Sequence, residues 1–204
     1  MSQSELSPMH LDALKEIGNI GMGNALTSLS QLVNQELSMT VPQTGFYPLE
    51  DVIAQVGGEE KLVSCVILRV LGDIQGTVMF VFDEQSTYLL IDLLMGLPEG
   101  STTMLDEMGQ SAVQEVGNVL TGSFTSAIGM LSQLKLVTTV PVFALDMLGA
   151  ILPSVMIASG RVEDKILAIE NELFQSNQKV KGHFFFFADP DAVDKLLEAL
   201  GLTQ

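Results

Sequence analysis

Residues 12–19, Asp-Ala-Leu-Lys-Glu-Ile-Gly-Asn, return 99 positions later as residues 111–118, Ser-Ala-Val-Gln-Glu-Val-Gly-Asn. The match continues without a gap to a Thr-Val-Pro sequence, which stands at 40–42 and again at 139–141. Self-similarity at a fixed spacing over this length indicates that the chain contains an internal duplication.

Both halves continue with the same types of predicted element. Residues 61–84 and 165–190 each read as two β-strands around polar turn residues. Residues 86–96 and 191–201 each read as a short amphipathic helix that ends at a glycine. Each half is therefore expected to contain a long helix, a short helical or irregular segment, a β-hairpin and a second helix.

These elements predict a single α/β (α+β) domain over residues 1–204. The repeats span about 7–98 and about 101–204, joined at the Gly-Leu-Pro-Glu-Gly sequence at 96–100. A single hairpin is only marginally stable, so the two hairpins are expected to merge into one mainly antiparallel sheet. The two long helices would lie on one face of the sheet, and a pseudo-twofold axis would relate the halves.

A polar stripe is predicted along each long helix. At about 100° per residue, the spacing i, i+4, i+7 and i+11 places four residues of the first helix in one narrow sector: Asp12, Glu16, Asn19 and Gly23. The hydrophobic residues fall mostly around the other side, which is expected to pack on the sheet: Leu11, Leu14, Ile17, Ala25, Leu29 and Leu32. The second helix repeats the stripe: Ser111, Glu115, Asn118 and Gly122. Both stripes are therefore expected to face solvent.

Glycines inside these helices need an explanation, because each costs about 1 kcal/mol relative to alanine. Gly18 and Gly117 lie off the stripes, so close helix packing is the expected reason for them. Gly23 and Gly122 lie within the stripes, where the missing side chain would let a partner protein approach closely.

The charge of the chain limits its partners. Nine Lys and Arg residues against 25 Asp and Glu residues give a net charge of −16, which repels nucleic acid and anionic lipid. No apolar run approaches the roughly 18 to 20 residues of a spanning helix, and residues 1–10 lack the features of a signal peptide. We therefore expect a cytoplasmic protein that does not insert into membranes.

The sequence offers no metal or nucleotide site. With two histidines, His10 and His183, and one cysteine, Cys65, neither a zinc site nor a Cys/His dyad can be assembled. Cys65 lies in an apolar run and is expected to be a buried thiol, while His183, beside four phenylalanines, is expected in a strand. The glycines of the first helix lack the spacing of a nucleotide-binding loop. We expect no cofactor of its own.

The repeated Glu and Asn are the residues best suited to chemistry. Exposed positions change most freely after a duplication, yet both residues are kept, whereas Lys15 is replaced by Gln114. An asparagine amide does not titrate but can hold a water molecule in place, and phosphoryl transfer depends mainly on such positioning. The glutamate can pair with a lysine of a partner. The stripes therefore favour hydrolysis of a phosphoryl group on a partner protein, which would supply any Mg²⁺.

The motif Asp-x-x-x-Glu-x-x-Asn, with a proline 23 residues after the Asn, resembles that of the CheC/CheX/FliY phosphatases of chemotaxis. It is present twice, as Asp12, Glu16, Asn19 and Pro42 and as Ser111, Glu115, Asn118 and Pro141. Two copies without an added flagellar-switch domain resemble the CheC branch of this family. The resemblance implies hydrolysis of the aspartyl-phosphate of the response regulator CheY, with Mg²⁺ bound in CheY. In this reading the two glutamates dock the substrate and the two asparagines place the hydrolytic water.

Residues 143–152, Phe-Ala-Leu-Asp-Met-Leu-Gly-Ala-Ile-Leu, resemble the CheC helix that docks the receptor deamidase CheD. From the residues alone the segment reads as a short apolar helix with one acid, for which core packing is the default. The resemblance implies that Asp146, Met147 and Gly149 contact CheD.

Two other functions compete with the phosphatase. A non-catalytic regulatory adaptor would sequester CheD or phosphorylated CheY without turning it over. A non-enzymatic component of the flagellar switch would need a switch-binding segment, which the sequence does not reveal.

Overall fold

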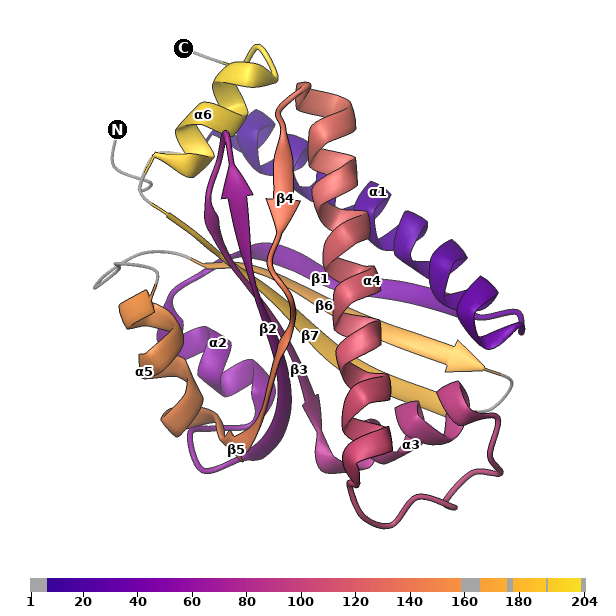
Figure 1. The fold of residues 1–204 in the computed structure, drawn as a ribbon. Coiled ribbons are helices and arrows are strands. Elements are labelled where there is room, and N and C mark those ends of the chain that lie inside the picture. Colours follow the sequence, from indigo (N-terminus) through magenta and orange to yellow (C-terminus); the bar gives the residue numbers. More distant parts are fainter. Residues whose placement is uncertain (1–6, 159–165, 176–177, 190, 203–204) are drawn as a thin grey trace.

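The computed structural model describes residues 7–158, 166–175, 178–189 and 191–202 (Figure 1). The first half contains α1 (Pro8–Val33), β1 (Ser38–Tyr47), α2 (Leu49–Val56), β2 (Leu62–Gly72), β3 (Gly76–Asp83) and α3 (Glu84–Met95). The second half contains α4 (Glu107–Ser132), β4 (Leu136–Thr138), β5 (Val142–Met147), α5 (Leu148–Ala158), β6 (Ile166–Gln175), β7 (Gln178–Ala188) and α6 (Ala192–Ala199). The two halves have the same order of elements, except that the strand after the second long helix is divided into β4 and β5.

The prediction was wrong about the segment that follows each long helix, which was expected to be helical or irregular. This segment begins with a strand, β1 in the first half and β4 with β5 in the second, and a short helix follows. A proline interrupts the pattern of hydrophobic residues in both copies, so the strands are recognisable only through their pairing with β6 and β2.

The strands form one antiparallel sheet in the order β1-β6-β7-β3-β2-β4, with β5 also paired to β2. The pairing of β3 with β7 joins the two halves and places Met79 opposite Phe185. These residues are equivalent in the duplication, because Gly-Thr-Val-Met at 76–79 corresponds to Gly-His-Phe-Phe at 182–185. A pseudo-twofold axis between them therefore relates the halves, as predicted.

The sheet is covered by helices on both faces (Figure 1). Val78 and Phe80 of β3 pack in a core with residues of α1, α3, α4 and α6, whereas Met79 and Val81 pack in a second core with residues of α2 and α5. Burial on both faces explains why the strand residues are continuously hydrophobic rather than alternating. The two long helices lie on the same face, as predicted.

The two long helices are in close contact with each other. A Cβ atom added at Gly21 of α1 would lie 3.0 Å from the Cα atom of Phe124 in α4. The Phe124 ring packs on Phe184 and Phe186 of β7, with centroid distances of 4.6 and 5.7 Å. The glycine therefore allows the helices to approach closely enough to bury this ring, an arrangement that offsets the helical cost of glycine.

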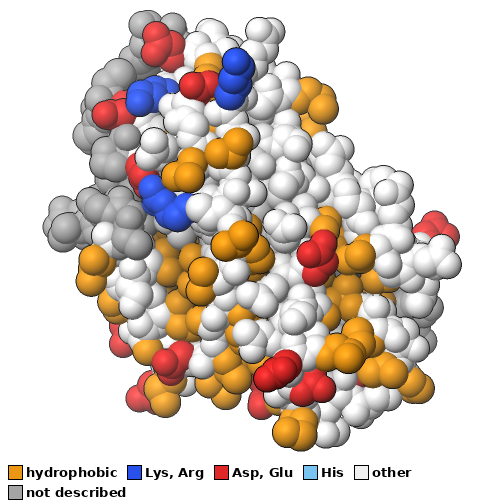
Figure 2. Space-filling view, viewed as in Figure 1, with side chains coloured by type: hydrophobic (Ala, Val, Ile, Leu, Met, Phe, Trp, Pro, Cys, Tyr) orange, Lys and Arg blue, Asp and Glu red, His pale blue; other side chains and the backbone are white. Residues whose placement is uncertain are grey.

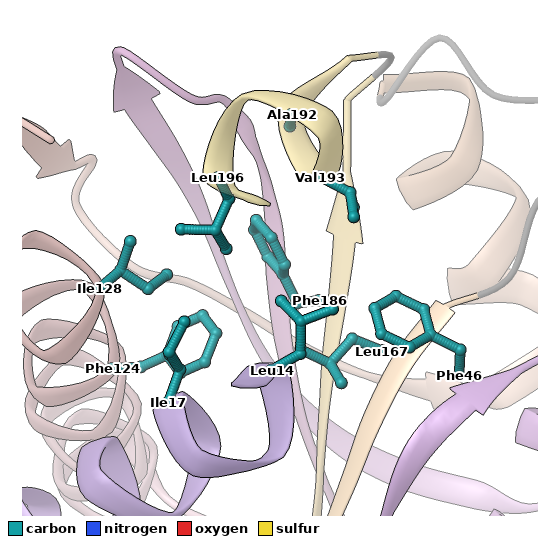
Figure 3. A pocket seen from close by; sticks show the side chains of 10 residues that line it. All are labelled: Leu14, Ile17, Phe46, Phe124, Ile128, Leu167, Phe186, Ala192, Val193 and Leu196. Carbon is teal, nitrogen blue, oxygen red and sulfur yellow. The ribbon is translucent and has the colours of Figure 1, made fainter. Parts of the chain in front are cut away.

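A small apolar cavity lies between the inner side of α1, helices α4 and α6, and the sheet (Figure 3). Only hydrophobic side chains line it: Leu14, Ile17, Phe46, Phe124, Ile128, Leu167, Phe186, Ala192, Val193 and Leu196. A void without polar groups cannot hold a bound water well, so the cavity belongs to the core rather than to a polar ligand site.

A buried carboxylate fixes the joint between the two halves. Asp92 of α3 is fully buried and accepts hydrogen bonds from the backbone N–H groups of Gly100 (2.8 Å), Ser101 (3.1 Å) and Thr102 (2.9 Å). It also accepts one from the Thr102 hydroxyl at 2.6 Å. Since the backbone of the joint satisfies this charge, the segment that leads into α4 is held against α3.

Replacement of Asp92 by Asn is expected to lower the free energy of unfolding by about 2 kcal/mol, because an amide NH₂ would face backbone donors in place of one carboxylate oxygen. Urea unfolding of the purified variant measures this loss. Glu99→Gln, in the same segment but exposed, is the matched control and should leave stability unchanged. Equal stability of both variants would contradict a role for the buried carboxylate.

Candidate functional site

The two long helices begin and end at equivalent positions. The N-cap of α1 is Ser7, whose hydroxyl accepts from the His10 N–H at 3.3 Å, and the N-cap of α4 is Asp106, whose carboxylate accepts from the Gly109 N–H at 2.7 Å. Both helices are 26 residues long and end before a residue in the left-handed conformation. The duplication therefore places the two stripes at the same heights on two matching helices.

The first stripe faces solvent, as predicted. All four of its residues are exposed: Asp12, Glu16, Asn19 and Gly23. The opposite side of α1 is buried at Leu14, Ile17, Ala25 and Leu29, which are at most 3% exposed. Leu32 is an exception to the prediction, since it lies beyond the last buried hydrophobic residue of α1 and is 48% exposed.

The second stripe has the same arrangement with one chemical difference. Ser111, Glu115 and Asn118 are exposed and Gly122 is half-buried. The Ser111 hydroxyl donates to the Glu107 carbonyl at 2.9 Å, so it is bonded to its own helix. The second stripe therefore lacks the carboxylate that Asp12 adds to the first.

Within the described ranges, the side chains of Glu16, Asn19, Glu115 and Asn118 make no hydrogen bond or ion pair. In each pair the residues are three positions apart, so they lie about 4.5 Å apart along the helix axis and point to the same side. Each carboxylate and carboxamide is therefore available to a second molecule.

Gly117, Gly23 and Gly122 divide as predicted between packing and open surface, and Gly18 is buried. A Cβ atom at Gly117 would lie 2.4 Å from a methyl carbon of Val66 in β2, so this glycine allows α4 to rest on the sheet. A Cβ atom at Gly23 or Gly122 would meet nothing within 4 Å. The open space beside each Glu/Asn pair can therefore admit the surface of another protein.

The proline of the first motif marks a bulge in β1. The pairing with β6 shifts between Thr40 and Gln43, so that β1 contains one residue more than the strand opposite. Pro42 lies in this interval, where its missing N–H group interrupts no ladder bond.

The proline of the second motif marks the equivalent interruption between β4 and β5. From Val70 to Ile67 of β2, the facing chain again contains one extra residue. The Thr139 hydroxyl accepts from the Arg69 N–H at 3.0 Å, and the Gln114 side chain donates to the Pro141 carbonyl at 3.3 Å. Because Gln114 precedes Glu115, this bond ties the bulge to the helix that carries the second stripe.

The prediction of a helix over residues 143–152 was wrong in its first half. Val142–Met147 form β5, which pairs with β2, and α5 begins at Leu148. Asp146 and Met147 are therefore exposed residues at the end of a strand, and the Asp146 carboxylate accepts from the Met147 N–H at 2.8 Å. A five-residue segment with four apolar residues next to a helix does not distinguish strand from helix by its sequence.

Gly149 has a packing role within the chain. A Cβ atom there would lie 3.0 Å from the Glu59 Cβ atom, and the Gly149 N–H donates to the Glu59 carbonyl at 2.9 Å. This contact holds the start of α5 against the turn before β2.

Other side chains that could react or bind a metal ion are buried or do not form a cluster. Cys65 is the buried thiol that the sequence predicted, and its burial raises the pKa of the thiol to about 12. His183 lies in β7, as predicted, and is buried. In the part of the chain that the structure describes, no group of three or more His, Cys, Asp or Glu residues is placed to hold a metal ion.

None of the described helices combines the length and the apolar composition needed to cross a membrane.

Comparison with a protein-family model matches two segments, residues 9–45 and 108–145, to the CheC-like family. Each segment contains one long helix, its stripe and the proline that follows. The model therefore matches both copies of the motif.

Among curated proteins, the chain is 32% identical to "CheY-P phosphatase CheC" of Bacillus subtilis over 197 residues, which cover 95% of this chain and 94% of that protein. It is 30% identical to "Flagellar motor switch phosphatase FliY" of the same organism over 133 residues, which cover 65% of this chain and 34% of FliY.

Among solved structures, FliY of Thermotoga maritima is similar to this chain with a TM-score of 0.79 and 25% identity, covering 98% of this chain and 99% of that one. A chain of the FliM-SpeE complex from H. pylori is similar with a TM-score of 0.72 at 9% identity, covering 97% of each chain. At that identity the likeness concerns the fold alone.

The two kinds of glycine predict opposite effects of alanine on stability. Gly23→Ala and Gly122→Ala should each raise the free energy of unfolding by up to about 1 kcal/mol, because alanine favours the helix and meets open space. Gly117→Ala should lower it by about 1 to 3 kcal/mol, because the methyl group overlaps Val66. Urea unfolding of the three variants measures both effects, and a loss of stability on Gly122→Ala would contradict the open surface.

Proposed function

Because the chain belongs to the CheC-like family, we propose that it is a chemotaxis phosphatase that hydrolyses the aspartyl-phosphate of phosphorylated CheY. The observation that carries this proposal is the pair of exposed Glu/Asn stripes at equivalent positions on α1 and α4. The names of the two Bacillus subtilis relatives, a CheY-P phosphatase and a flagellar motor switch phosphatase, support the same chemistry.

In this proposal the asparagines act on the attacking water. The carboxamide of Asn19 or Asn118 accepts and donates hydrogen bonds, so it can hold one water in line with the bond that breaks. The water oxygen bonds to phosphorus as the bond between phosphorus and the aspartyl oxygen breaks, which yields inorganic phosphate and the free carboxylate. Mg²⁺ held by CheY neutralises the charge on the phosphoryl oxygens, so the phosphatase needs no metal of its own.

The glutamates position the substrate. Glu16 and Glu115 each lie about 4.5 Å along the helix from the asparagine of the same pair. A carboxylate at that distance can pair with a lysine beside the phosphorylated aspartate of CheY and so fix the register of the helix on its surface. The open space at Gly23 and Gly122 supports this docking, since it lets the partner come near the helix backbone.

The asparagines give the sharpest test. Asn19→Ala with Asn118→Ala should reduce phosphate release from phosphorylated CheY by about 100- to 1,000-fold, the cost of losing a group that positions a reacting species. Each single variant should retain the activity of the other site. Continuous measurement of released phosphate at substoichiometric phosphatase gives these rates.

The matched control is Asn24→Ala. Asn24 is an exposed asparagine on α1, about 140° around the helix from Asn19, so its loss should leave the rate unchanged. A double variant that is folded by circular dichroism and still fully active would disprove the role of the asparagines.

A regulatory adaptor is the competing function, and one surface favours binding of a further protein. β5 pairs with β2 on one edge, and no described strand pairs with its other edge. Hydrophobic side chains on this strand are exposed, with Val142 at 59%, Leu145 at 48% and Met147 at 53%. Hydrophobic side chains also gather over β5 and α5 in Figure 2. Turnover at substoichiometric protein separates a phosphatase from an adaptor that only sequesters phosphorylated CheY.

We propose that this edge is where CheD binds. Asp146 and Met147 supply an exposed carboxylate and an exposed apolar group on the same strand. Gly149 shapes the start of α5 through its contact with Glu59, and its part in CheD binding would be indirect. The edge belongs to the end of the sheet away from β1.

Met147→Glu is expected to weaken CheD binding by at least about tenfold, because a second carboxylate would be desolvated beside Asp146. Titration calorimetry with purified CheD measures the affinity. Met130→Glu, which changes a methionine that is 70% exposed near the end of α4, should bind CheD like the wild type. Unchanged CheD affinity in the Met147 variant would exclude this edge.

A further inference from the structure

Both long helices begin with an exposed methionine at the same position. Met9 is the second residue of α1 and Met108 is the second residue of α4, and they are equivalent in the duplication. Their side chains are 63% and 62% exposed. Two large apolar groups are therefore left in solvent at matching places.

The methionines extend the two stripes. In each helix the methionine lies three residues before Asp12 or Ser111, which places it within about 80° of the Glu and Asn side chains around the helix axis. It lies ten residues, or about 15 Å along the axis, from the asparagine. A partner that covers the Glu/Asn pair therefore reaches the methionine with the same surface.

The fold itself explains neither methionine. The N-cap bonds are made by Ser7 and Asp106, and neither methionine belongs to a hydrophobic core. Flexible and polarisable methionine side chains are enriched where a protein buries apolar surface against a partner. Because Glu and Asn supply only polar contacts, an apolar contact would add affinity that the stripes otherwise lack.

We propose that Met9 and Met108 are docking residues that bury against an apolar patch of the phosphorylated receiver protein, about 15 Å from its phosphoaspartate. The proposal rests on the proposed phosphatase function and deepens it. The methionines set the affinity for the substrate protein, and the Glu/Asn pairs act on the phosphoryl group. Each methionine adds affinity for a substrate protein that is bound at the Glu/Asn pair of its own helix.

The test uses two readouts on the full chain. One is KM and kcat for phosphate release from phosphorylated CheY, and the other is the Kd for CheY carrying beryllofluoride, which mimics the phosphorylated aspartate without being hydrolysed. Met9→Ala with Met108→Ala should raise KM and Kd about tenfold, which corresponds to about 1.4 kcal/mol, and leave kcat unchanged. Met9→Leu with Met108→Leu should restore both to within about twofold of the wild type, since leucine is also apolar.

Ile157→Ala is the control, because Ile157 is 80% exposed on α5, which packs on the other face of the sheet. It should change neither readout. Wild-type KM and Kd in the double alanine variant would overturn the docking role, as would a fall in kcat at unchanged KM. Wild-type protein that binds the beryllofluoride form without hydrolysing phosphorylated CheY would refute the phosphatase alone, and the Kd comparison would still decide the docking role.

Discussion

The pairing of β3 with β7 is the contact on which the whole arrangement depends. It runs antiparallel around Met79 and Phe185, so one half of the chain is turned by half a rotation relative to the other. That rotation brings both long helices to the same face of one continuous sheet. Because the paired strands are buried on both faces, separation of the halves would expose two cores at once. The centre of the sheet and the direct contact of α1 with α4 together fix the relative position of the two Glu/Asn pairs.

Stability and the proposed function depend on different sides of the two long helices. The buried sides of α1 and α4 pack on the sheet. The residues on their outer sides are therefore not needed for this packing. The similarity to a chain of the FliM-SpeE complex, at 9% identity, shows that very different sequences adopt the same architecture. We therefore expect the function to depend on the residues of the outer sides rather than on the fold.

The sequence predicted the parts of the structure that local periodicity and the repeat control. The spacing of Glu16 and Asn19 and its return 99 residues later predicted two exposed stripes, and both are exposed except at the half-buried Gly122. The prediction of a helix at β5 was wrong because Phe143 to Met147, with the single acid Asp146, is too short to show a period. β1 was missed because its bulge at Pro42 breaks the alternation, and only its pairing with β6 stabilises it. Met9 and Met108 already match in sequence, but exposure distinguishes them from core residues, and exposure is a property of the folded chain.

The close approach at Gly21 limits how this protein can be divided. In the duplication Gly21 corresponds to Leu120 and Ala25 corresponds to Phe124, so a small residue in one helix faces a large one in the other. Two copies of the first half would bring only small residues together at the crossing and leave a void, while two copies of the second half would crowd leucine against phenylalanine. The two halves therefore fit each other at this crossing better than either would fit a second copy of itself.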